Sequence, residues 1–149
     1  VGYTFKPNAT TVAVNIFATP NNTTKNTRVT NHEIGHAVDH VLGLPSQNAG
    51  SVYNQKLALD KALFNAKPIS VFDNYGGLST TCALEADNYK RMQCTWPTDA
   101  KPVYELYASA YGARVPGGVN PTDLMSLLNT EFPNVRAYMD NVRKGATAP

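Results

Sequence analysis

One segment constrains this chain more than any other: residues 30–45, which read TNHEIGHAVDHVLGLP. It holds all three histidines of the sequence, and residues 32–36 have the pattern H-E-x-x-H. Thr30 has capping-box spacing to the glutamate, while Gly43 is a typical residue at a helix end. The segment therefore predicts a helix over residues 31–42.

The spacing of this motif suits a zinc ion. Residues four apart on a helix share one face, so His32 and His36 can reach one metal. Glu33 lies one position round and predicts a general base beside a zinc-bound water. The alternative is an ordinary amphipathic helix with exposed His and Glu. Gly35 costs up to about 1 kcal/mol relative to alanine in mid-helix, so we expect another element to approach closely there.

A catalytic zinc needs a third protein ligand. His40 lies about 12 Å from His32 along the helix axis, too far to share the ion. A carboxylate is therefore expected, and the downstream candidates are Glu85, Glu105 and Glu131. Glu105 is favoured because the small residues 108–110 allow close helix packing, although a first-turn glutamate can also simply complement the helix dipole. Asp39, on the ligand face, either orients a ligand histidine or is solvated.

The rest of the chain predicts helices after one strand. Alternating apolar residues indicate a strand over 11–18, and a loop follows at 19–27. Further helices are expected at 52–66, 81–92, 101–113, 121–130 and 133–144, with loops at 67–80 and 95–102. This order predicts a single α+β domain over residues 1–149, dominated by helices, with a small sheet before the H-E-x-x-H helix.

Composition excludes some classes of partner. The net charge of +2, without a basic run, argues against nucleic acid, and no apolar run reaches membrane-spanning length. We expect a monomer. The chain begins at Val1 without a signal-peptide pattern, so we expect a processed form or a domain of a longer protein. Cys82 and Cys94 form either a disulfide or two free thiols, and sequons at Asn8 and Asn21 weakly favour export.

Two segments resemble a known family. HEIGHAVDHVLG resembles the active-site helix of the anthrax lethal factor family of zinc metallopeptidases, which includes the Pro-Pro endopeptidases. ELYASAY, residues 105–111, is similar to the family's downstream ligand helix. The resemblance implies a zincin-like, gluzincin-type domain with zinc ligands His32, His36 and Glu105 and general base Glu33. It also implies hydrolysis of peptide bonds in a protein or peptide substrate by a secreted protease or an exported toxin or effector.

The chain also departs from that family. Ser109 stands where relatives often have a second glutamate, and Thr98 where they have a tyrosine that stabilises the oxyanion. The remaining candidates for that tyrosine are Tyr75, Tyr89 and Tyr104. We expect the substrate to lie along strand 11–18 by strand addition. The alternative function is a catalytically silent zincin-like binding module with structural zinc, but such a site would not need Glu33.

Overall fold

The computed structural model describes residues 2–5, 13–16, 22–116 and 123–145. Eight α-helices occupy most of these residues: α1 (Thr23–Val41), α2 (Val52–Asn65), α3 (Thr80–Ala83), α4 (Asn88–Thr95), α5 (Pro97–Ala100), α6 (Val103–Ala113), α7 (Leu124–Glu131) and α8 (Pro133–Arg143). Two 3-10 segments are η1 (Pro45–Gln47) and η2 (Ile69–Tyr75), and two strands are β1 (Gly2–Phe5) and β2 (Ala13–Ile16).

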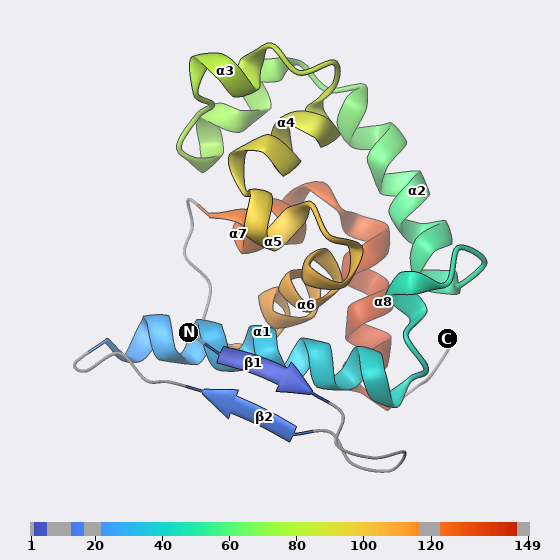
Figure 1. Ribbon diagram of the computed structural model, residues 1–149. Coiled ribbons are helices and arrows are strands. Elements are labelled where there is room, and N and C mark those ends of the chain that lie inside the picture. The colour runs from blue at the N-terminus through green and yellow to red at the C-terminus, as the bar shows by residue number, and fades with distance from the viewer. Residues whose placement is uncertain (1, 6–12, 17–21, 117–122, 146–149) are drawn as a thin grey trace.

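The prediction of an α+β fold is wrong, because the described residues form a helical domain. β1 and β2 are antiparallel, with Gly2 opposite Ile16, and make a single hairpin alongside α1 (Figure 1). Among the residues whose side chains are described, which exclude those of the two strands, the hydrophobic core comes from helices and their connections. An isolated two-stranded hairpin is at best marginally stable in water, so it cannot organise the fold as a sheet layer would. The remaining residues of the predicted strand 11–18 lie outside the described part of the chain.

The helix that carries H-E-x-x-H is longer than predicted. α1 begins at Thr23 and not near residue 31, so Thr30 is an interior helical residue and no capping box starts there. The extra turns contain threonine, asparagine and valine, which are weak helix formers. Their helical state has tertiary support, because Arg28 in these turns forms an ion pair with Asp123 and α1 packs against α6, β1 and β2 (Figure 1).

Most of the other predicted helices are confirmed within a few residues, as α2, α6, α7 and α8. The single helix predicted at 81–92 is wrong. The side chain of Asp87 accepts a hydrogen bond from the Lys90 backbone and starts α4 as a separate helix. The Cys82–Cys94 disulfide then links α3 to α4. The predicted loops also contain local structure, namely η2 within 67–80 and α5 within 95–102.

Large aromatic side chains fill the core between the helices. Phe64 of α2 contacts the rings of Phe72 and Phe132, at centroid distances of 5.5 and 5.4 Å. A second group joins Tyr53 to Tyr107 and Tyr138. α6 lies between this core and α1, so it connects the core to the H-E-x-x-H helix (Figure 1). Among the described residues, no helix combines the length and apolar character needed to cross a bilayer.

Candidate metal centre

Two glycines bring the backbones of α1 and α6 into contact. A Cβ atom added at Gly35 would lie 2.7 Å from the Cα and carbonyl oxygen of Ala108. On the other helix, a Cβ at Gly112 would lie 3.2 Å from backbone atoms of Asn31 and His32. A side chain at Gly35 would collide with the backbone of Ala108, whereas one at Gly112 would require its neighbours to shift by a few tenths of an ångström. The close approach predicted at Gly35 is therefore confirmed.

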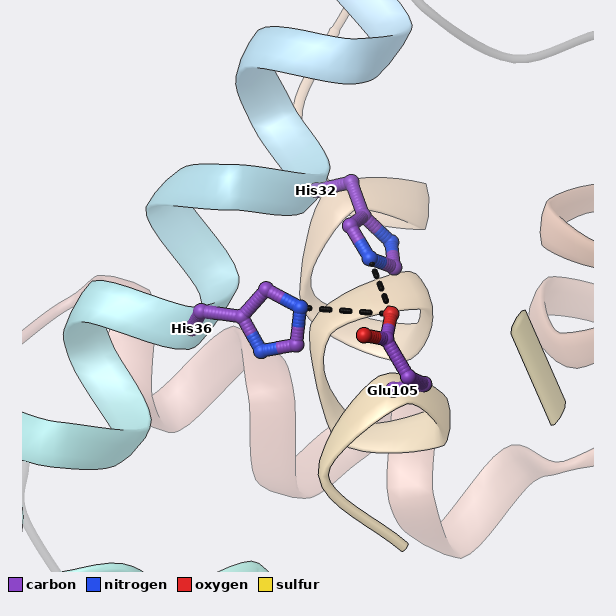
Figure 2. A group of neighbouring side chains, drawn as sticks. All are labelled: His32, His36 and Glu105. Carbon is purple, nitrogen blue, oxygen red and sulfur yellow. Dashed lines mark hydrogen bonds and ion pairs between the residues drawn. The ribbon is translucent and has the colours of Figure 1, made fainter. Parts of the chain in front are cut away.

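This crossing places three potential metal ligands together. The Nε2 atom of His32 lies 2.7 Å from Oε2 of Glu105, and Nε2 of His36 lies 3.2 Å from the same oxygen. The imidazoles extend from successive turns of α1 toward the first turn of α6 (Figure 2). One atom from each residue lies within 4.8 Å of the others, so a modest inward movement of the side chains would bring all three to the bond length of about 2 Å that zinc requires.

The electrostatics of the cluster favour a charged Glu105. Burial alone would raise its pKa, but hydrogen bonds with His32 and His36 and the charge on those rings outweigh burial and lower the pKa to about 2. Burial lowers the pKa of His36, yet its contact with Glu105 and the neighbouring carboxylates raise it more. An ionised carboxylate and two imidazole nitrogens are the donor set that zinc prefers, so these residues fit the ion.

Ser109 orients one of the histidines. Its Oγ lies 3.2 Å from Nδ1 of His32 and donates a hydrogen bond to the backbone oxygen of Asp99, 3.3 Å away. Since that hydroxyl uses its proton on Asp99, it accepts from an Nδ1–H of His32. This leaves Nε2, the nitrogen that contacts Glu105, as the one available to bind a metal, which is the tautomer a metal ligand requires. Ser109 follows Glu105 by four residues on α6, so helical spacing was a usable signal for this role.

Glu33 faces a cavity that opens onto the cluster. The cavity has a volume of about 420 Å³, and its lining includes Glu33, His32 and Glu105. Its walls include four apolar side chains, those of Val29, Trp96, Leu124 and Met125. Glu33 itself is buried, so its carboxylate is largely shielded from solvent beside the potential ligands.

The other ionisable residues of α1 do not join the cluster. Asp39 is buried and accepts hydrogen bonds from the backbone N–H and the hydroxyl of Ser46, at 3.0 and 2.5 Å. It thus stabilises the turn after α1, and neither predicted role, histidine orientation or solvation, describes that contact. Burial raises the pKa of Asp39 despite these bonds. His40 lies outside the group that can share one ion, as its distance along the helix predicted.

The alternative third ligands lie elsewhere. Glu85 is exposed in the connection between α3 and α4. Glu131 is buried at the end of α7, where it accepts a hydrogen bond from the Tyr75 hydroxyl and pairs with Lys67. Neither glutamate belongs to the group with His32 and His36 among the described residues. Of the three candidate acids, the fold brings only Glu105 to the histidines.

The three candidate tyrosines are also separated by the fold. Tyr75 belongs to the core and is bound to Glu131. Tyr89 is buried, which raises its pKa to about 12, and its ring packs under Lys61. Tyr104 is the exposed one, and its ring centroid lies 5.9 Å from that of His36. Tyr104 alone of the three therefore lies beside the cluster.

Comparison with known proteins adds no relative: no protein-family model, curated protein or solved structure matches this chain. The resemblance to the lethal factor family therefore depends on the two short segments in which it was found. What the chain can do has to be inferred from the geometry of its own residues.

Proposed function

We propose that this protein is a zinc-dependent endopeptidase related to the anthrax lethal factor and Pro-Pro endopeptidase group. One observation carries the proposal. His32, His36 and Glu105 converge from two helices, and Glu33 lines the same cavity as two of them. A purely structural zinc site would need the three ligands and a fourth, but no buried carboxylate facing a cavity.

The chain's own residues supply most of the required chemistry. His32, His36 and Glu105 would hold the zinc, which when bound polarises a carbonyl and lowers the pKa of a water to about 7. Glu33 is the base that accepts a proton from the attacking water and returns it to the leaving amine. Ser109 keeps His32 in the tautomer that leaves Nε2 free to bind a metal.

The setting we propose is outside the reducing cytosol. The Cys82–Cys94 bond supports a secreted protease or an exported toxin domain, because disulfides persist mainly in oxidising compartments. The substrate is then a protein or peptide met after export. Mass spectrometry of the protein recovered from its native source, with and without reductant, tests whether the bond is present there.

Substitution of the base tests the catalytic proposal. Glu33→Gln keeps the shape of the side chain but removes the proton acceptor, so cleavage of a mixed peptide library should fall about 10²–10⁴-fold. Zinc content and helical signal should stay at wild-type values. Glu85→Gln is the matched control, since it removes an exposed carboxylate far from the cluster. Chelation should abolish cleavage, and added zinc should restore it.

The possible failures point to different conclusions. Full activity in Glu33→Gln would show that another group activates the water. One zinc per chain in a wild-type protein that cleaves no peptide would instead support the silent binding module. A wild-type protein that binds no stoichiometric metal would overturn both, and Glu105→Ala against Glu85→Ala would show which acid is the ligand.

A further inference from the structure

We infer that the cavity beside Glu33 binds a substrate side chain such as glutamine, with an apolar stem and an uncharged hydrogen-bond acceptor at its tip. Arg28 donates the hydrogen bond to this tip. The inference rests on the proposed peptidase function, since it assigns the cavity to a residue close to the scissile bond. Arg28 lines the cavity and precedes His32 by four residues, so it lies on the ligand face of α1, one turn away.

An ion pair holds Arg28 in place without using up its donors. Its Nη1 lies 2.5 Å from Oδ2 of Asp123, and the two side chains are 33% and 20% exposed. The other oxygen of Asp123 accepts a hydrogen bond from the Ser126 backbone at the start of α7. A guanidinium has five N–H donors, and this contact engages one of its nitrogens. Asp123 therefore fixes Arg28 to α7, with other donors left for a ligand in the cavity.

The charges around the cavity select against ionised tips. Its carboxylates are those of Glu33, Asp99, Glu105 and Asp123, and Arg28 is its one lysine or arginine among the described residues. Four negative charges, one positive charge and a zinc ion of two positive charges leave a net charge of −1 with neutral histidines. A substrate carboxylate would be repelled by this excess, and a substrate ammonium at the position of the tip would be repelled by the adjacent Arg28 guanidinium. An uncharged carbonyl acceptor avoids both penalties.

The remaining walls fit an unbranched apolar stem. Val29 comes from α1, Trp96 lies between α4 and α5, and Leu124 and Met125 come from the first turn of α7. A volume of about 420 Å³ falls within the range of about 300–1,000 Å³ typical of ligand pockets. Apolar walls with a few convergent donors are how such pockets combine affinity with selectivity.

Peptide cleavage by the zinc-loaded protein tests the inference. A mixed library first locates the cleavage site, and three peptides are then made that differ only by Gln, Met or Glu at the selected position next to it. For the wild-type protein, kcat/KM should follow the order Gln, then Met, then Glu. Arg28→Met should lower the ratio of Gln to Met about tenfold, the effect of one lost hydrogen bond to a charged donor. Arg28→Lys keeps the charge but loses the planar guanidinium, so its ratio of Gln to Met should lie between those of the wild type and Arg28→Met.

Each outcome bears on one proposal only. Arg136→Met is the control, because this exposed arginine of α8 does not line the cavity, and it should keep the wild-type ratio. A wild-type preference for lysine in the library, or for glutamate among the three peptides, would overturn the inference, and so would a Gln preference that Arg28→Met leaves unchanged. A zinc-loaded wild-type protein that cleaves no library peptide would instead overturn the peptidase function itself. If Arg28→Lys unfolds at the wild-type temperature, the contact with α7 is intact. A change in its selectivity then reflects recognition of the substrate side chain.

Discussion

The α1–α6 crossing and the aromatic core between α2, α7 and α8 are built in opposite ways. At the crossing, Gly35 meets the backbone of Ala108, so the helices touch without intervening side chains. In the core, Phe64 and Phe132 fill the space between elements with fully buried rings. Contact between backbones fixes positions closely, whereas packed side chains mainly supply buried apolar area.

The two kinds of packing correspond to the different roles of the crossing and the core. The crossing must bring His32, His36 and Glu105 within reach of one ion, and displacements of about 0.5–1 Å already weaken such a site. The core has to exclude water and can tolerate small shifts. We therefore expect substitutions in the core to change stability more than zinc binding, and substitutions at the crossing to change zinc binding more than stability.

The largest stability effect should come from Phe64→Ala. This ring is fully buried against Phe72 and Phe132, so its removal should lower the free energy of unfolding by about 3–5 kcal/mol. Zinc affinity of the remaining folded protein should be unchanged in a chelator competition. Leu63→Ala, at a neighbouring position that is 51% exposed, should cost less than about 0.5 kcal/mol. A large loss of zinc affinity in folded Phe64→Ala would contradict the expectation that the core affects stability more than zinc binding.

Removal of the disulfide should have the next largest effect. Cys82 and Cys94 are 12 residues apart, and a bond closing a loop of this size stabilises a protein by about 3 kcal/mol. The double variant Cys82→Ser/Cys94→Ser should therefore unfold at lower denaturant concentration, with its zinc affinity unchanged. Wild-type protein unfolded in reductant should match the variant. Equal stability of the two forms would mean that α3 and α4 are held by other contacts.

Gly35→Ala should move the two helices apart. The new methyl group would lie 2.7 Å from backbone atoms of Ala108, which cannot rotate away. After the gain of about 1 kcal/mol in helix propensity, we expect a net loss of about 1–3 kcal/mol, with weakened zinc binding. Gly112→Ala should be milder, because its contacts are at 3.0–3.2 Å and include the flexible end of Met125. A stabilised Gly35→Ala variant with normal zinc affinity would show that the close approach is not required.

The smallest expected change in stability is that of Ser109→Ala. Loss of the contact with Nδ1 of His32 should weaken zinc binding about 10–100-fold, as is typical for partners of ligand histidines. Stability of the metal-free protein should change little. Ser51→Ala is the contrasting variant, because loss of this N-cap of α2 should cost about 1 kcal/mol of stability without altering zinc affinity. Identical zinc affinities in wild type and Ser109→Ala would remove Ser109 from the site.

Local sequence patterns predicted some features of the site and missed others of the fold. The helical spacing of His32 and His36 and the unusual Gly35 were enough to expect a ligand face and a close neighbour there. The start of α1 was missed, because Thr23 to Thr30 has weak helix propensity and becomes helical through its tertiary contacts. The fold class was missed for a related reason, since alternation within 11–18 indicates a strand but not how many partners it has.

The sequence by itself determined which residues of α1 share a face, that His40 is too distant, and that a carboxylate from elsewhere must complete any zinc site. The first two follow from the fixed rise and period of a helix, and the third from the absence of any histidine outside this segment. Only the tertiary structure decided among Glu85, Glu105 and Glu131, assigned Asp39 to Ser46, and joined Arg28 to Asp123. Those pairings depend on how separate helices cross, and the crossing is set by long-range packing that no local pattern records.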